Sequence, residues 1–168
     1  MDKRKGKIIM GTANQIEQEL MSYISDHKIR NTHSHHLPEQ AMVDFDLDKL
    51  INNTYLQWQQ VTPGTTAESR TAYLEKTRYK SCFVWLQKAI GELYGISEPI
   101  TAQNWDQISD QIRKAHQNPG FYMDVLKNKC KYQSVVVDTY WNPGSDNGRP
   151  ELFTPAFRLD LFFLGYKK

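Results

Sequence analysis

The stretch Ile29-Arg30-Asn31-Thr32-His33-Ser34-His35-His36-Leu37-Pro38-Glu39 decides the fold class that this sequence predicts. Its first part is typical of a short strand, from Ile29 to about Ser34. Leu37-Pro38-Glu39 ends that strand, because proline has no N–H to donate to a sheet ladder. A segment with apolar residues at helical spacing comes before it, from Thr12 to about His27. The pattern therefore predicts a helix and then a strand that ends in a cluster of histidines.

A long helical region is predicted after this strand. Apolar residues recur at helical spacing from about Leu47 to Cys130. Within it, Thr65 and Glu68 are expected to form a capping box at the start of one helix, and Gly95 is expected to end another.

A second strand is predicted at Ser134–Asp138, where a continuous β-branched run is typical of a buried parallel strand. Strands separated by helices indicate parallel β-α units. We therefore expect an α/β fold in a single domain, residues 1–168, with residues 39–130 as a helical insertion. The apolar tail, Phe157 to Tyr166, is expected to be a third strand or a helix.

The histidine cluster predicts a metal site. Side chains in a strand alternate between two faces, so His36 is expected to point away from a face that carries four residues: Ile29, Asn31, His33 and His35. Two imidazoles on one face can bind one ion, which makes His33 and His35 the candidate ligands; the alternative is a surface cluster without an ion. Imidazole suits zinc, iron, manganese and nickel, so the expected cofactor is a divalent metal ion, zinc foremost.

Three more residues are candidates for the same site. Asp138 ends the second strand, and it is predicted to be a third metal ligand or a general base; the alternative is a helix cap or a carboxylate facing a loop. Arg149 lies in the polar loop that follows and is predicted to bind a substrate carboxylate in bidentate fashion, or else to be a solvated arginine. Tyr55 is predicted to line a substrate pocket.

Composition narrows the class of protein. The chain has 168 residues, 39% of them hydrophobic, which is enough for the core of one domain. No apolar run approaches the roughly 20 residues of a membrane span, and the basic N-terminus is followed by too few apolar residues for a signal peptide. Beyond that N-terminus no basic stripe predicts nucleic-acid binding. Cys82 and Cys130 are expected to be reduced thiols in a cytoplasmic protein.

The segment Ile29-Arg30-Asn31-Thr32-His33-Ser34-His35 resembles the Asp-Thr-His-x-His signature at the end of the first barrel strand in the amidohydrolase superfamily. The helical region resembles the insertion after that strand in uronate (glucuronate) isomerases. Three segments carry this second likeness, which extends over most of the chain: Asn53–Trp58, Leu86–Ile96 and Ile100–Asp106.

The resemblance implies the N-terminal part of a metal-dependent (β/α)8 TIM barrel that interconverts aldose and ketose forms of a sugar acid such as glucuronate or galacturonate. It carries over only His33 and His35, as metal ligands, and Asn31 stands where the family usually has an acid. Because a full barrel takes about 250 residues, we expect a partial barrel without turnover of its own. Exposed strand edges then predict a homo-oligomer or a complementing chain.

Two other functions are compatible with the sequence. A hydrolase of the same superfamily, acting on an amide, ester or lactone, would use the ion to activate water. A non-catalytic helix-rich module would bind a partner through its apolar stripes, with the histidines incidental. Either enzyme would have a small-molecule partner, a sugar acid or a related substrate, and neither a nucleic acid nor a membrane is expected.

Overall fold

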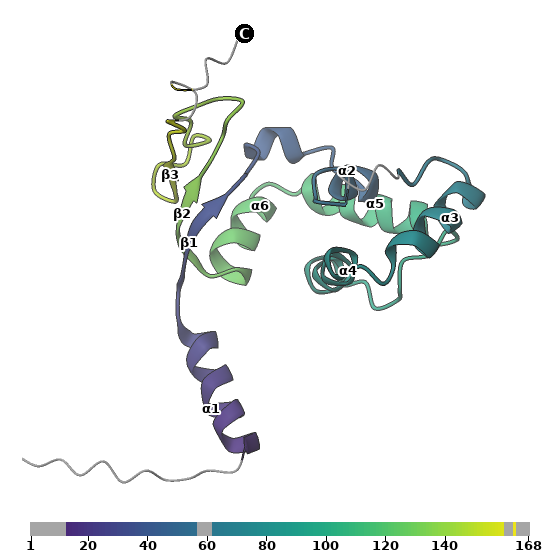
Figure 1. The fold of residues 1–168 in the computed structure, drawn as a ribbon, viewed down its shortest axis with the longest axis horizontal. Helices are drawn as coiled ribbons and strands as arrows, with labels where there is room; N and C mark the ends of the chain where they lie inside the picture. Colours follow the sequence, from purple (N-terminus) through teal and green to yellow (C-terminus); the bar gives the residue numbers. More distant parts are fainter. Residues whose placement is uncertain (1–12, 57–61, 160–162, 164–168) are drawn as a thin grey trace, which may run out of the picture.

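The computed structural model describes residues 13–56, 62–159 and 163. Three strands form one sheet in the order β1-β2-β3, and both neighbouring pairs are parallel (Figure 1). Their bounds are Ile29–Ser34 for β1, Tyr132–Val137 for β2 and Phe153–Pro155 for β3. The predicted class is confirmed as a mixed α/β fold with a small parallel sheet.

The predicted helical region is confirmed between β1 and β2. Helices α2 to α5 lie to one side of the sheet, and α6 lies between them and the strands (Figure 1). The elements of this region, in chain order, are η1 (Glu39–Met42), α2 (Leu47–Asn52), α3 (Ala67–Thr77), α4 (Ser81–Tyr94), α5 (Trp105–His116), α6 (Phe121–Asp124) and its π-helical continuation η3 (Val125–Lys129).

The ends of two helices test the expected boundary signals. Helix α4 is followed by Gly95 at φ 68°, a left-handed conformation that glycine adopts without a Cβ penalty, so this stop is confirmed. The capping box of α3 is formed instead by Thr66 and Ser69, whose side chains each bond to the other's backbone N–H. Because α3 begins at Ala67, Thr66 rather than Thr65 occupies the N-cap position.

Two clusters of buried side chains hold these elements together. The helical cluster is built around the large rings of Tyr73, Phe83 and Trp105, all of which are at most 1% exposed. The sheet cluster packs one face of the strands against α6 and η3. Its members are Tyr122, Leu126, Val135, Val137, Leu152 and Phe153. Burial of these apolar side chains is the main favourable term for both units.

The third strand lies at Phe153–Pro155, before the tail Phe157 to Tyr166 for which the sequence predicts a strand or a helix. Within that tail, residues 157–159 form neither helix nor strand, Phe163 is helical, and 160–162 and 164–166 lie outside the described residues. The strand is only three residues long and includes a proline, which the sheet tolerates at its edge. Such a short apolar run gives no period-2 signal.

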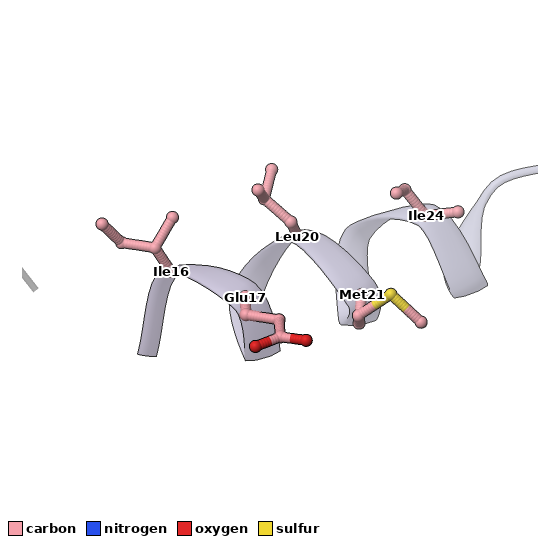
Figure 2. Close-up of a pocket in the computed structure, with 5 residues that line it drawn as sticks. All are labelled: Ile16, Glu17, Leu20, Met21 and Ile24. Atoms are coloured by element: carbon pink, nitrogen blue, oxygen red, sulfur yellow. The ribbon is translucent and has the colours of Figure 1, made fainter. Parts of the chain in front are cut away.

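Helix α1 (Ala13–Asp26) confirms the predicted first helix. It extends from the N-terminal end of β1, away from the other helices (Figure 1). Its apolar side chains Ile16, Leu20 and Ile24 lie along one side of the helix and are exposed, with Glu17 and Met21 beside them (Figure 2). This surface belongs to a single helix and is not an enclosed cavity.

Candidate metal centre

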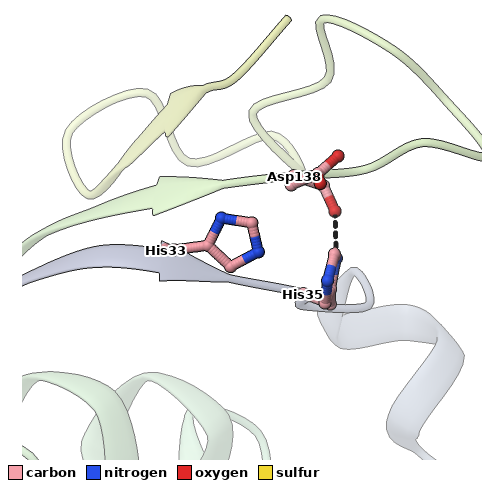
Figure 3. Close-up of side chains that lie close together, drawn as sticks. All are labelled: His33, His35 and Asp138. Carbon is pink, nitrogen blue, oxygen red and sulfur yellow. Dashed lines mark hydrogen bonds between the residues drawn. The ribbon is translucent and has the colours of Figure 1, made fainter. Parts of the chain in front are cut away.

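Three side chains that the sequence predicts as site residues meet at one edge of the sheet. One potential ligand atom from each of His33, His35 and Asp138 lies within 4.8 Å of the other two. His33 is in β1, His35 directly follows β1, and Asp138 directly follows β2 (Figure 3). The carboxyl ends of parallel strands lie at the same edge, which is why residues more than a hundred positions apart come together.

The pairing of β1 with β2 places these side chains on one face. The Asp138 amide donates to the Ser34 carbonyl at 2.8 Å, which fixes the two strand ends side by side. The register shifts between Asn31 and Ser34, so the regular alternation expected for β1 is interrupted. The prediction that Asn31 shares a face with the two histidines is therefore wrong. His33 and His35 do lie on one face, and their ring centroids are 5.0 Å apart.

The ring of His35 is oriented by the backbone of Asp138. Nδ1 of His35 lies 2.7 Å from the Asp138 carbonyl oxygen (Figure 3). A carbonyl only accepts hydrogen bonds, so Nδ1 carries the proton and Nε2 is the nitrogen left with a lone pair for a metal ion. Metal-binding histidines usually have their second nitrogen held in this way.

The Asp138 carboxylate is paired with a residue that sequence reasoning missed. Nε of Arg158 donates a hydrogen bond to Oδ2 at 2.8 Å, and Nη2 forms an ion pair with the same oxygen at 2.7 Å. The side chain of Asp138 is 5% exposed. Hydrogen bonding from Arg158 holds the pKa of this carboxyl below its ordinary value, and the charges of Arg158, His35 and His33 act in the same direction. Asp138 is therefore ionised at neutral pH.

Two aromatic side chains from the loop after β2 stand beside the cluster. The His35 ring lies 5.9 Å from the ring of Tyr140 and 6.3 Å from that of Trp141. The guanidinium of Arg158 lies over the Tyr140 ring at 5.2 Å. Tyr140 and Trp141 are both substantially exposed, so their rings lie beside the site at the surface of the molecule. A cation over an aromatic face is attracted to the ring by a cation–π interaction, which stabilises both side chains in this position.

His36 points to the other side of the sheet, as expected from alternation. Its ring packs 5.3 Å from Phe153 and 6.5 Å from Tyr122, both in the sheet cluster. Burial lowers the pKa of His36, and the charge of nearby His35 lowers it further. Among the described residues its buried Nε2 has no hydrogen-bond partner. His36 is therefore a neutral packing residue.

Arg149 and Tyr55 are not brought into the cluster. Arg149 Nη2 donates to Glu39 Oε2 at 2.9 Å, and this ion pair joins the loop after β2 to η1. Tyr55 lies in the turn after α2 and is 63% exposed. The loop also reaches the site segment through Asn147, whose Nδ2 donates to the His36 carbonyl at 2.8 Å. These contacts fix the position of the segment that follows β1.

The three donors fit a divalent metal ion by their chemistry and approximately by their spacing. Two imidazoles and one carboxylate form a mixed N/O set that zinc, iron, manganese and nickel accept. With metal–ligand bonds of ~2.1 Å, ligand atoms around a tetrahedral ion lie ~3.4 Å apart. The longest separation in the cluster is at most 4.8 Å, so rotamer adjustments of about 1 Å would complete the geometry.

No protein-family model matches this chain, and no curated protein matches it. Among the described helices, none has the length and apolar character required to cross a membrane. Cys82 and Cys130 are half-buried free thiols.

Proposed function

We propose that His33, His35 and Asp138 bind one divalent metal ion and that the chain carries the metal centre of an enzyme of uronate isomerase type. The observation that carries the proposal is the convergence of three ligand atoms within 4.8 Å at the carboxyl ends of two adjacent parallel strands. Functional groups in β/α enzymes gather at this edge of the sheet. The resemblance of the Asn31–His35 segment to the amidohydrolase signature supplies the enzyme class.

The residues of this chain take distinct roles in the proposed centre. His35 binds through Nε2, because the Asp138 carbonyl holds Nδ1. Asp138 is assigned as the third ligand, because its lowered pKa keeps it a carboxylate and makes it a weak proton acceptor. A bound divalent ion supplies Lewis acidity toward a carbonyl or hydroxyl oxygen of the substrate. We assign substrate contact to Tyr140 and Trp141, because both are exposed beside His35.

One observation favours a hydrolase as the second candidate. Isomerisation moves a proton between adjacent carbons and needs a side-chain base, and the lowered pKa that Arg158 gives Asp138 makes this carboxylate a weak one. Hydrolysis of an amide, ester or lactone relies more on the acidity that a bound ion gives to water. Binding of glucuronate and of its lactone, each followed by tryptophan fluorescence with metal present, separates the two candidates, because Trp141 lies beside His35.

The metal content of the purified chain tests the proposal directly. We expect near-stoichiometric metal by mass spectrometry, and loss of that metal in a variant that combines His33→Ala and His35→Ala. His27→Ala is the matched control, because His27 is an exposed histidine at the end of α1 and lies outside the cluster. Absence of metal from the wild-type chain, or metal retained in the double variant, contradicts the proposal.

A further inference from the structure

The side chain of Asn31 bonds to the backbone of the histidine two residues later. Its Oδ1 accepts a hydrogen bond from the His33 amide at 3.1 Å. Asparagine and aspartate form this local turn readily, because the short side chain places an oxygen within reach of the second N–H along the chain. The bond lies inside the part of β1 where the register with β2 shifts.

The register shift inserts one extra residue into β1. Asn31 is paired with Val135 and Ser34 with Val137, so three steps along β1 match two steps along β2. Paired residues in a sheet project to the same side, and Val135 and Val137 are both fully buried. Asn31 and Ser34 therefore lie on the core side although they are an odd number of positions apart, as a β-bulge produces.

This irregularity decides on which face the histidines lie. Regular pairing continued from Asn31 and Val135 would place His33 opposite Val137, on the buried side of the sheet. With the extra residue, His33 lies on the opposite side, as does Asp138, which follows Val137. The cluster of His33, His35 and Asp138 thus depends on the shift between Asn31 and Ser34.

We propose that Asn31 is a positioning residue for the metal centre: its side-chain oxygen holds the His33 amide and fixes the bulge that turns His33 toward Asp138. This inference rests on the proposed metal centre for its consequence, although the backbone geometry can be measured without metal. A side-chain carboxylate oxygen can accept the same bond, so aspartate at position 31 serves equally well. Position 31 therefore requires a hydrogen-bond acceptor on a side chain as short as that of asparagine or aspartate.

Variants at position 31 distinguish the effect of the side-chain oxygen from the effect of the rest of the side chain. Asn31→Ala removes the acceptor, Asn31→Gln moves it too far along the side chain, and Asn31→Asp retains it. Zn²⁺ affinity is measured by competition with a chromophoric chelator. We expect the Ala and Gln variants to bind Zn²⁺ about 10- to 100-fold more weakly, which is the usual cost of removing a group that orients a ligand. The Asp variant is expected to retain wild-type affinity.

Two measurements without metal make the role of Asn31 testable on its own. Hydrogen exchange at the His33 amide is expected to be faster in the Ala and Gln variants and unchanged in the Asp variant. Nuclear Overhauser contacts between the side chains of His33 and Asp138 are expected to weaken in the same two variants. Circular dichroism checks that each variant is folded. If Asn31→Ala does not fold, Asn31→Gln takes its place as the variant without a correctly placed acceptor.

The outcomes distinguish this inference from the proposed function. Wild-type His33 exchange and wild-type Zn²⁺ affinity in the folded Ala or Gln variant overturn the role of Asn31 and leave the metal centre standing. A wild-type chain that binds no Zn²⁺ overturns the proposed function, and the exchange and Overhauser data then still decide whether Asn31 fixes the bulge. Loss of affinity in Asn31→Asp equal to that in Asn31→Ala also contradicts the inference.

Discussion

The guanidinium of Arg158 is paired with a single oxygen of Asp138: Nε donates a hydrogen bond at 2.8 Å, and Nη2 lies 2.7 Å away as an ion pair. The same guanidinium lies over the ring of Tyr140. One arginine thereby joins the segment after β3 to the end of β2 and to the loop beside the candidate metal centre. The carboxylate is almost completely buried and the guanidinium is about one-third exposed. Removing the arginine would leave a buried charge without its main partner, which is more costly than losing an exposed pair.

Replacement of Arg158 by methionine is expected to lower the free energy of unfolding by roughly 2 kcal/mol at neutral pH, after allowance for the partial exposure of the guanidinium. Chemical denaturation measures the change. Arg149→Met is the matched control, since it breaks the more exposed pair with Glu39 and is expected to cost less than about 1 kcal/mol. Equal losses of unfolding free energy in the two variants would show that the Arg158–Asp138 pair stabilises the fold no more than the exposed Arg149–Glu39 pair does.

The contribution of Arg158 is expected to depend on pH in a defined direction. Asp138 has a lowered pKa in the folded chain, so the stabilisation is present above the unfolded carboxyl pKa of about 3.9 and is lost as the pH falls through the folded value. The difference in unfolding free energy between wild type and Arg158→Met should therefore be constant near pH 7 and shrink below about pH 4. A difference that grows on acidification contradicts this assignment.

His36 is expected to make the fold sensitive to mild acid. Burial lowers its pKa in the folded chain, so the unfolded chain takes up a proton first and stability falls as the pH drops below the unfolded value of about 6.5. His36→Phe removes this uptake and should reduce the loss of stability between about pH 7 and pH 5, while half-buried His116, whose pKa is also lowered, keeps its own contribution. Thermal melts across that range measure it, with His27→Ala, which changes an exposed histidine, as the control.

Phe153 tests whether the short third strand is a structural part of the sheet. Its side chain is 2% exposed and belongs to the sheet cluster. Phe153→Ala is expected to lower the free energy of unfolding by about 3–5 kcal/mol, because it leaves a cavity between the strands and α6. Phe157→Ala, at a position that is 65% exposed, should cost less than about 1 kcal/mol. Similar costs for the two variants would contradict the packing of β3.

The side chains of β1 are exposed or half-buried, so its prediction rests on the short stretch that Leu37-Pro38-Glu39 ends and not on residues that face a core. The helical spacing of apolar residues and the β-branched run at Ser134–Asp138 were sufficient to predict the helices and β2, because these apolar residues do face a core. Sequence patterns were sufficient for His33, His35 and Asp138 as well, since the carboxyl ends of parallel strands share an edge. They did not predict β3, which is three residues long, or Arg158, which reaches Asp138 from 20 positions further along the chain.

The bulge at Asn31 could not be read from the alternation of polar and apolar residues. An extra residue in a strand is set by pairing with a distant strand and by a local side-chain bond, and neither changes the composition of the segment. The sequence marks Arg149 and Tyr55 as candidates by their chemical type alone. The structure pairs Arg149 with Glu39 instead, an interaction that joins residues 110 positions apart and leaves no local sequence signal.

The ligands of the candidate centre lie on both sides of the helical region, and His35 and Asp138 are 103 positions apart. In the proposed centre, an ion bound to both would act as a cross-link that closes a long loop of chain, in the manner of a disulfide. Such a link restricts the unfolded ensemble, and its entropic benefit increases only slowly with loop length. The helical region can therefore gain or lose residues with little effect on the strength of the link, provided that its two ends stay where β1 and β2 hold them.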